Sequence, residues 1–559
     1  MSSEPDLVYV ALGGAGEIGM NMYLYGHGSG EDRRWIMVDC GVSFPDMETS
    51  PGVDLIMADP AFISERADRL DGIFITHAHE DHVGAIGHLW AELQAPIFAR
   101  EFTAAFVRLK MAEAGYEDAT VHVCPPHPRS VQAGPFRVSF VPVSHSIPDA
   151  SALVIETSAG RVIHTGDFKI DRTPQVGDPF DEAMFWQLAQ TRVDALICDS
   201  TNVFSTHPGR SEADLAEPIA ELVKSAPGLV VATTFASNVA RLRTLALAGQ
   251  AAGRGIAVRG RAMRRMIGLA REHGLIDDFP QVLTDEELLD TPSEHLMVLA
   301  SGSQGERRAA MSHIASGSND RLRLGPGDVV LFSSKTIPGN EPAVARVQNR
   351  FAETGARVVD ESDGLYHVSG HANRPDLKSL HYLLQPGLVV PMHGEQRHLQ
   401  EHAALARESG FPALIAPNGT MVRIAGGPAE ILGEVETGRL YLDGIMLVGA
   451  LDGVVRERIR LAIRGLVAVS VVIDQNGDLA ADPVAEVIGI STDLDDELTD
   501  LVAEIEDVAE LAIERAERAQ KRDDDEVRRV ISAACSQLCN RLVGKKPVIS
   551  VLVSRVEVE

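Results

Sequence analysis

The chain has 559 residues, of which 45% are hydrophobic and 23% are charged, and 80 acidic against 51 basic residues give a formal net charge of −29. This length exceeds what one hydrophobic core supports and predicts roughly three to four domains. The composition excludes a membrane-spanning protein, because no apolar run reaches about eighteen residues, and the overall acidity argues against a nucleic-acid partner.

The N-terminus and the cysteines predict a cytoplasmic protein. The opening MSSEPDLVYV lacks the basic and apolar regions of a signal peptide. The cysteines are scattered and odd in number, which favours reduced thiols; they are Cys40, Cys124, Cys198, Cys535 and Cys539. The last two are four residues apart on a predicted helix, so a buried helical face explains them better than a metal site does.

The first motif along the chain is the glycine-rich GGAGEIG. Gly14, Gly16 and Gly19 fit the G-x-G-x-x-G spacing of dinucleotide-binding proteins, and Asp39 follows about twenty residues later. That fingerprint requires a helix after the third glycine, because the pyrophosphate binds the free N–H groups of the helix. The following MNMYLYG instead alternates with a period of two and predicts a strand. We therefore expect a bend between strands and no nicotinamide cofactor.

The segment LDGIFITHAHEDHVGAIGHL carries the most chemistry. Its first part predicts a short apolar strand, HAHEDH a tight turn, and VGAIGHL the start of a helix. Burying so many unpaired imidazoles would cost several kcal/mol, which excludes a core element. His77 and His79 are expected to face one point, while Asp81 and His82 face a second point nearby. Such nitrogen and carboxylate donors suit zinc or manganese.

Further ligands are expected at the ends of three later strands. RVSFVPVSHSIPDA delivers His145, RVIHTGDFKID delivers Asp167, and GLVVPMHGEQRHLQ delivers His393. Each residue taken singly would be read as an ordinary histidine or turn aspartate. Their shared position at strand ends, together with the first cluster, favours a two-metal site in which the carboxylate of Asp167 bridges the ions.

HAHEDH, SHSIPDA, TGDFKID and ALGGAGEIGMN together resemble the metallo-β-lactamase superfamily. The resemblance implies an α/β fold in which two sheets lie between helices, an αββα sandwich, with a dimetal site along one edge. The implied cofactors are two Zn²⁺ or Mn²⁺ ions that share Asp167. One ion is held by His77, His79 and His145, and the other by Asp81, His82 and His393.

A domain-sized stretch separates Asp167 from the last ligand strand. It alternates helix-like and strand-like segments, which predicts a parallel α/β layer. Such an insert resembles the β-CASP domain of nucleic-acid-processing members of the superfamily. Asp199 in CDSTN, His371 in HVSGHA and His393 in PMHGE match its three motifs, and a histidine at the third motif favours RNA over DNA.

ATTFASNVARL, ASGSQGE, FSSKTIPGNE and HVSGHA resemble the bacterial ribonuclease J family over essentially the whole chain. The resemblance implies a 5′-to-3′ exoribonuclease that prefers 5′-monophosphorylated RNA, also cuts internally, and acts in mRNA decay and rRNA 5′ maturation. It adds Asp199 and His371 as catalytic residues that orient a ligand, stabilise the phosphorane or move a proton. A metallo-hydrolase of small esters or lactams and a catalytically silent RNA-binding scaffold are the alternatives.

Small-residue loops are predicted to bind RNA phosphate through backbone N–H groups. A plain turn explains each loop equally well when it is taken singly. The candidate residues are Ser237, Asn238, Ser303, His367, Val368, Ser369, Gly370 and His371. By the resemblance, one such pocket recognises a 5′-monophosphate.

Basic residues gather in the middle of this acidic chain. A basic middle is compatible with a channel for a polyanion, but solvated helix faces explain the arginines equally well. The residues concerned are Arg254, Arg259, Arg261, Arg264, Arg265, Arg307, Arg308, Arg321 and Arg323.

The domain organisation follows from these matches. We expect residues 1–208 and 368–445 to form two parts of the metallo-β-lactamase domain, and residues 209–367 to form the β-CASP domain. Residues 446–463 are expected to be a linker and 464–559 a C-terminal α/β domain, in which strands such as RGLVAVSVVID and helices alternate.

An exposed apolar sheet in the C-terminal domain would suit a homodimer or a dimer of dimers, as the resemblance also implies, and a domain docked on its own chain is the alternative. Single-stranded RNA and RNA-degradation proteins such as a helicase are the other expected partners. Asp443, with carbonyl oxygens near Ser50 and Gly52, is expected to hold a structural Ca²⁺ ion as in relatives.

Overall fold

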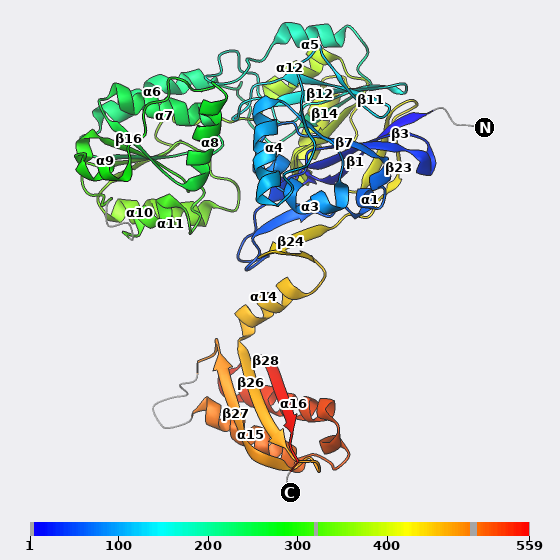
Figure 1. Ribbon diagram of the computed structural model, residues 1–559, viewed down its shortest axis with the longest axis vertical. Helices are drawn as coiled ribbons and strands as arrows, with labels where there is room; N and C mark the ends of the chain where they lie inside the picture. Colours follow the sequence, from blue (N-terminus) through cyan, green and yellow to red (C-terminus); the bar gives the residue numbers. More distant parts are fainter. Residues whose placement is uncertain (1–4, 318–321, 492–499, 558–559) are drawn as a thin grey trace. The chain divides into compact units, whose positions relative to one another are not determined.

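The computed structural model describes residues 5–317, 322–491 and 500–557 (Figure 1). The chain divides into two compact units, one made of residues 1–43 and 57–439 and the other of residues 44–56 and 440–559. Within the described ranges, no helix is both long enough and apolar enough to cross a membrane.

The first unit contains an eight-stranded sheet in which the N-terminal strands pair antiparallel, as their period-two pattern predicts. The chain bends between β1 and β3, and no helix follows Gly19. Gly14 has φ +86°, and a Cβ there would lie 2.3 Å from Asn21 Oδ1, so this bend needs glycine. The sheet order is β23 (Glu430–Glu434), β22 (Thr420–Ala425), β1 (Asp6–Gly13), β3 (Met22–Gly28), β4 (Arg34–Val38), β7 (Leu70–Phe74), β8 (Ile97–Ala99) and β9 (Val121–Val123).

A six-stranded sheet packs on the first and shares a hydrophobic core with it. Tyr9 and Phe74 of the first sheet and Phe140 and Ile197 of the second belong to this core. The last three strands are parallel to one another, so their carboxyl ends lie at one edge. The order is β10 (Val131–Ala133), β11 (Phe136–Pro142), β12 (Ser151–Thr157), β13 (Gly160–His164), β14 (Ala195–Asp199) and β20 (Val389–Met392).

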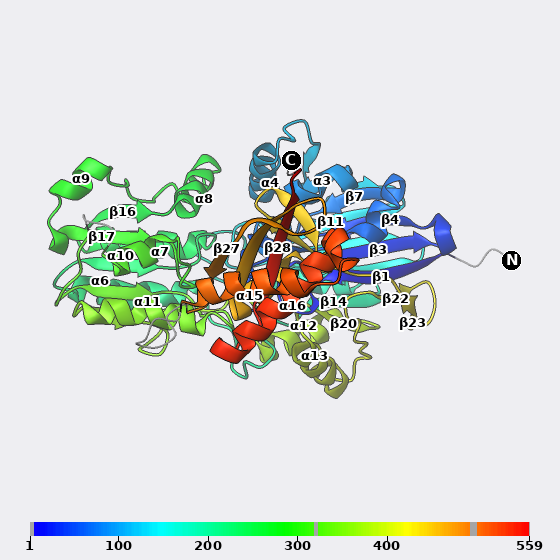
Figure 2. The same cartoon turned by 90° about the horizontal axis from the view of Figure 1, so that it is seen from below.

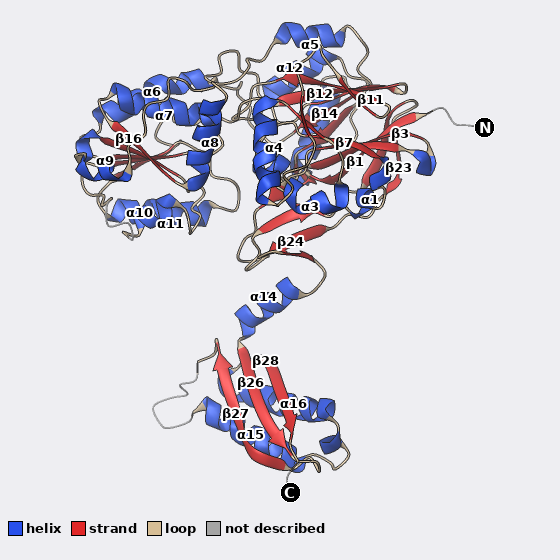
Figure 3. Cartoon of the chain, viewed as in Figure 1, coloured by secondary structure: helices blue, strands red, loops and turns tan. Residues whose placement is uncertain are grey.

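Helices cover the outer face of each sheet, which completes the αββα sandwich and confirms the predicted fold class (Figure 3). On the first sheet, α3 (Ile86–Leu93) packs on α4 (Glu101–Glu113), which contacts β8 and β9. Leu and Phe side chains of three other helices form a second core with the six-stranded sheet. These helices are α5 (Glu182–Ala189), α12 (Arg374–Leu384) and α13 (Gln396–Glu408).

The inserted segment forms the predicted parallel α/β layer. Its three central strands are apolar and fully buried, as expected for a parallel sheet between helices, whereas one edge strand begins with the exposed Arg357. The order is β16 (Gly255–Arg259), β17 (Leu296–Ala300), β15 (Val230–Thr233), β18 (Val329–Phe332) and β19 (Arg357–Val359). The surrounding helices are α6 (Ala216–Ser225), α7 (Val239–Ala251), α8 (Arg261–Glu272), α9 (Asp285–Asp290), α10 (Ala310–Ala315) and α11 (Glu341–Glu353).

The second unit contains a three-stranded sheet with two helices on one face, as the sequence predicts (Figure 3). The sheet order is β27 (Leu479–Ile488), β26 (Leu466–Ile473) and β28 (Val548–Arg555), and the helices are α15 (Leu501–Arg515) and α16 (Asp524–Val543). The segment expected to be a linker carries β25 (Met446–Gly449), paired with β24 (Arg439–Asp443), and most of α14 (Val454–Arg464).

Asp6 at the start of β1 forms ion pairs with Arg33 and Arg423. Burial alone would raise the pKa of this carboxyl, but the two guanidinium groups hold it below its usual value of 3.8. These pairs therefore stabilise the folded state above about pH 4, and the stabilisation is lost as pH falls through the lowered pKa. Asp6→Asn is expected to cost about 1 kcal/mol at pH 7 and almost nothing near pH 2. Thermal melting at both pH values tests this, and an equal loss at both would contradict it.

Candidate metal centre

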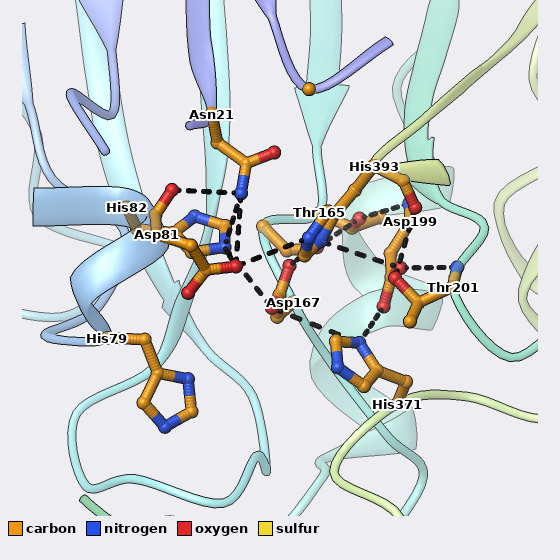
Figure 4. A network of polar contacts seen from close by, with 12 residues as sticks. Asn21, His79, Asp81, His82, Thr165, Asp167, Asp199, Thr201, His371 and His393 are labelled. Atoms are coloured by element: carbon orange, nitrogen blue, oxygen red, sulfur yellow. Dashed lines mark hydrogen bonds and ion pairs between the residues drawn. The ribbon is translucent and has the colours of Figure 1, made fainter. Parts of the chain in front are cut away.

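The histidine-rich segment lies just beyond the carboxyl end of β7, where the chain enters the short helix α2 (Glu80–Val83) (Figure 4). The helix begins inside the predicted turn, earlier than the sequence suggests. Asp81 and His82 therefore lie on its first turn, whereas His79 precedes it with an extended backbone. This change of backbone direction separates the donors into the two predicted groups.

The first group brings together ring nitrogens of His77, His79 and His145. Nε2 of His77 and Nε2 of His145 lie 3.1 and 3.0 Å from Nδ1 of His79. Two nitrogens bound to one tetrahedral zinc ion at about 2.0–2.1 Å are roughly 3.3 Å apart, close to these distances. Burial lowers the pKa of all three imidazoles, that of His79 to about 4. At neutral pH they are therefore in the uncharged form that binds metals.

The second group consists of Asp81, His82 and His393, and Asp167 lies between the two groups (Figure 4). Oδ2 of Asp167 is 3.2 Å from His82 Nε2 and 3.6 Å from His145 Nε2, so one carboxylate oxygen faces both groups. Nε2 of His393 is buried and lies 3.4 Å from Asp81 Oδ2, without the geometry of a hydrogen bond. A buried ring nitrogen and a carboxylate oxygen that face each other in this way fit two ligands of one cation.

The charges of the second group also suit cations. Burial alone would lower the pKa of His393, but the neighbouring Asp167 and Asp81 carboxylates raise it to about 10. The pKa of Asp167 would rise on burial, yet His393 and His82 hold it well below its usual value. Carboxylates that favour charged imidazoles this strongly would equally favour a divalent ion. The mixture of imidazole and carboxylate donors is of the kind that zinc and manganese accept.

Asp199 and His371 form a hydrogen-bonded pair at the edge of these groups (Figure 4). Nδ1 of His371 lies 2.8 Å from Asp199 Oδ2 and 3.9 Å from Asp167 Oδ2. The backbone N–H of Thr201 donates to the other oxygen of Asp199 at 2.9 Å. Burial alone would lower the pKa of His371, but the charges of Asp199 and Asp167 raise it. Asp199 thus holds one ring nitrogen, which leaves Nε2 for a further partner.

Two buried residues outside the predicted ligand set orient it. Asp39 Oδ2 accepts a hydrogen bond from His82 Nδ1 at 2.7 Å, which turns Nε2 of that histidine toward Asp167. Nδ2 of Asn21 donates to the backbone oxygen of Asp81 at 3.0 Å. Asp39 has φ +62°, a conformation that residues other than glycine adopt mainly where surroundings impose it.

Neither orienting role could be recognised from local spacing. The partners lie 43 residues away for Asp39 and 60 residues away for Asn21. The sequence offered two weak signals. Asp39 is a polar residue at the end of the buried strand in MVDCG, and Asn21 is a polar residue directly before the strand MYLYG.

The predicted HVSGH loop lies directly against the first donor group. The carbonyl oxygen of Gly370 accepts a hydrogen bond from His145 Nδ1 at 2.6 Å. A Cβ at Gly370 would lie 2.8 Å from that imidazole, so only glycine permits this approach. Ser369 Oγ accepts a hydrogen bond from the backbone of His371 at 3.1 Å, and Val368 is buried.

The other predicted substrate residues lie on loops at the carboxyl edge of the parallel sheet. Ser237 and Asn238 follow β15, and Ser303 follows β17. Asn238 is buried, and its side chain caps α7 by accepting from the backbone N–H of Arg241 at 2.9 Å. Ser303 is also buried. Contact of these three residues with RNA stays a prediction.

The expected structural cation site lies in the second unit. The carboxylate of Asp443 pairs with Arg458 at 2.5 Å, and a Cβ on Gly52 would lie 3.1 Å from the same guanidinium. The guanidinium group of Arg458 therefore already pairs with the carboxylate that was expected to bind calcium. Calcium binding by Ser50, Gly52 and Asp443 stays a prediction.

The sandwich fold and the two donor groups define a metal-dependent hydrolase of the metallo-β-lactamase class. Comparison with family models agrees: residues 34–226 match the beta-lactamase superfamily domain and residues 227–351 the ribonuclease J beta-CASP domain. Residues 362–417 match a Zn-dependent metallo-hydrolase RNA specificity domain and residues 453–556 the ribonuclease J C-terminal domain.

Similar proteins extend this agreement over the full chain. Ribonuclease J of Sinorhizobium meliloti is 41% identical over 558 residues, which covers 100% of this chain and 98% of that protein. Ribonuclease J of Mycolicibacterium smegmatis is 38% identical over 485 residues, and the match covers 85% of this chain and 84% of that protein. The chain belongs to the ribonuclease J family and is a metal-dependent ribonuclease.

A more distant solved structure shares the fold alone. The crystal structure of a protein of unknown function from Enterococcus faecalis V583 has a TM-score of 0.50 at 16% identity, covering 76% of this chain and 100% of that one.

Proposed function

We propose that the protein is a 5′-to-3′ exoribonuclease that prefers 5′-monophosphorylated RNA, also cuts internally, and acts in mRNA decay and rRNA 5′ maturation in the cytoplasm. The observation that carries the proposal is the contact between the HVSGH loop and His145. This contact places a loop that is predicted to bind a terminal phosphate beside the hydrolytic groups, which favours cleavage measured from the 5′ end. The full-length similarity to ribonuclease J supports the same activity.

Two zinc or manganese ions are the proposed cofactors. The residues that would hold them are His77, His79 and His145 for one ion, Asp81, His82 and His393 for the other, and Asp167 for both. When bound, such ions lower the pKa of water and neutralise charge on phosphoryl oxygens.

The chain's own residues supply orientation and proton transfer. Asp199 fixes the ring of His371 through Nδ1, so Nε2 is the atom that donates a proton to the leaving oxygen or stabilises developing charge. The backbone of the HVSGH loop positions the RNA phosphate. Asp39 accepts a hydrogen bond from Nδ1 of His82, which holds the ring in the tautomer whose Nε2 would bind the ion.

The proposal is tested with single-stranded RNA carrying either a 5′-monophosphate or a 5′-triphosphate, labelled internally and at the 5′ end. Purified protein and a His77→Ala variant are incubated with manganese or zinc. Release of mononucleotides from the monophosphorylated RNA, absent in the variant, is expected. Internal cuts that ignore the 5′ end would indicate a mainly endonucleolytic enzyme. Absence of any RNA cleavage would favour an ester or lactam hydrolase, or a silent scaffold.

Homodimerisation through the C-terminal sheet is the proposed assembly. The sheet face opposite α15 and α16 exposes Val484 on β27 and Leu552 on β28 to 64% and 62%. Both residues pair with Ser470 of the central strand β26, so they flank that residue on the same face of the sheet. A Val484→Lys/Leu552→Lys variant is expected to sediment as a smaller species than the unchanged protein. Identical sedimentation coefficients would exclude this face as the interface.

A further inference from the structure

An arginine-lined pocket lies on the β-CASP part of the first unit, away from the residues of the metal centre. It has a volume of about 530 Å³ and is bounded by the loop after β17 and by α10 and α11. These two helices contact each other on one face of the parallel sheet (Figures 1 and 2). Its charged lining consists of Arg307, Arg346 and Arg350, and among the described residues no acidic side chain lines it.

The three arginines lack the partners that neighbouring arginines have. Among the described residues, no carboxylate lies within ion-pair distance of them, whereas Arg259 pairs with Asp285 and Arg265 with Glu113. Arg346 and Arg350 are four residues apart on α11 and so share a helix face. All three side chains are exposed. On a chain of net charge −29, three unneutralised guanidinium groups around one hollow mark a place that attracts anions.

The pocket is joined to the predicted substrate loops by hydrogen bonds. Gly305 lines it, and the adjacent Gln304 donates to Lys335 O at 3.0 Å and accepts from the N–H of Ile337 at 2.8 Å. The loop after β17 is thereby fixed to the loop after β18. Ser333 Oγ in turn donates to Tyr366 O at 2.7 Å, directly before the HVSGH loop.

The sheet topology places these loops where parallel sheets bind ligands. β16 and β17 lie on one side of β15, and β18 and β19 lie on the other. In such sheets, ligands bind beyond the carboxyl ends of the strands where the connections diverge. The loops after β17 and β18 both leave from this edge.

The chemistry of the pocket favours a strand over an enclosed small molecule. A small-molecule site buries most of its ligand against apolar side chains, whereas Val347 is the one large apolar residue that the described part of the chain contributes to this lining. Exposed guanidinium groups bind phosphate oxygens in pairs of hydrogen bonds. We propose that the pocket binds the phosphodiester backbone of the RNA strand outside the catalytic centre. This inference rests on the proposed action on single-stranded RNA.

The test measures RNA binding by fluorescence anisotropy in EDTA, so that no RNA is cleaved. It uses 5′-monophosphorylated RNA of about five and about 25 nucleotides, lengths that span the site sizes of single-strand binders. Arg346→Glu/Arg350→Glu is compared with the unchanged protein. Arg129→Glu/Arg541→Glu is the control, because it makes the same charge change at two exposed arginines elsewhere.

Arg346→Glu/Arg350→Glu is expected to weaken binding of the long RNA by at least about tenfold. Because two phosphate contacts are lost, the slope of log affinity against log salt should fall by about 1.4. Binding of the short RNA and its cleavage with manganese should change less than about twofold, as should all values for the control.

Three results would overturn the proposal: unchanged long-RNA binding, an equal loss with the control, or an equal loss for short RNA. Competition by a nucleoside monophosphate is measured in the same anisotropy assay. Loss of this competition in the variant, with long-RNA binding retained, would also overturn the proposal and identify a free-nucleotide site. If the unchanged protein binds long RNA through this pocket but never cleaves RNA, the proposed function fails while the binding inference stands.

Discussion

Asp167→Asn is expected to lower the rate of RNA cleavage by about 10³-fold or more and to deplete the protein of bound metal. The reason is that Oδ2 of Asp167 faces both donor groups, 3.2 Å from His82 Nε2 and 3.6 Å from His145 Nε2. Metal assistance contributes several kcal/mol to such reactions, and about 1.4 kcal/mol corresponds to a factor of ten. Single-turnover cleavage and elemental analysis of the purified protein measure the two effects separately.

Two neighbouring variants serve as controls for the Asp167 experiment. His371→Ala is expected to slow cleavage by about 10²–10⁴-fold while the metal content is retained, because His371 acts on a proton. Asp39→Asn is expected to weaken metal affinity by about 10–100-fold, because it only orients His82. If Asp167→Asn keeps its metal and its rate, the proposed bridging role is wrong. If His371→Ala loses metal as Asp167→Asn does, His371 is a ligand rather than a proton donor.

Arg241→Met is expected to destabilise the first unit by about 3–5 kcal/mol, because it leaves a buried carboxylate without its partner. Arg241 on α7 is fully buried, and its guanidinium contacts both oxygens of Glu212 at 2.5 and 2.9 Å. It also donates to Ser333 O at 2.7 Å. For a domain of about 150–250 residues, the size of the β-CASP part that carries Arg241, this loss lowers the thermal transition by roughly 6–20 °C.

A double variant separates the ion pair from simple loss of packing. Arg241→Met/Glu212→Met removes both charges and is expected to recover part of the stability lost in Arg241→Met. Circular dichroism melting curves of the single and double variants supply the comparison. If the stability losses of Arg241→Met and of Glu212→Met add up to the loss of the double variant, the pair contributes no coupling energy, which would contradict the expectation.

Local sequence pattern determined the strand after GGAGEIG and the composition of the metal-binding segment. MNMYLYG alternates with a period of two, and this pattern by itself excludes a helix N-terminus for a dinucleotide. HAHEDH places its donors within six residues, so neighbouring backbone geometry alone brings them together. The parallel layer was predictable for the same reason, because short apolar runs alternate with helical ones.

Only the tertiary structure decided which distant residues meet. Asp39 reaches His82, Gly370 reaches His145 across 225 residues, and Arg241 reaches Glu212 and Ser333, and none of these contacts leaves a local spacing in the sequence. The arginine pocket has the same origin, because Arg307 lies on a loop after β17 and Arg346 on α11. Sequence patterns record the period of each element, whereas the packing of elements against one another fixes which side chains share a site.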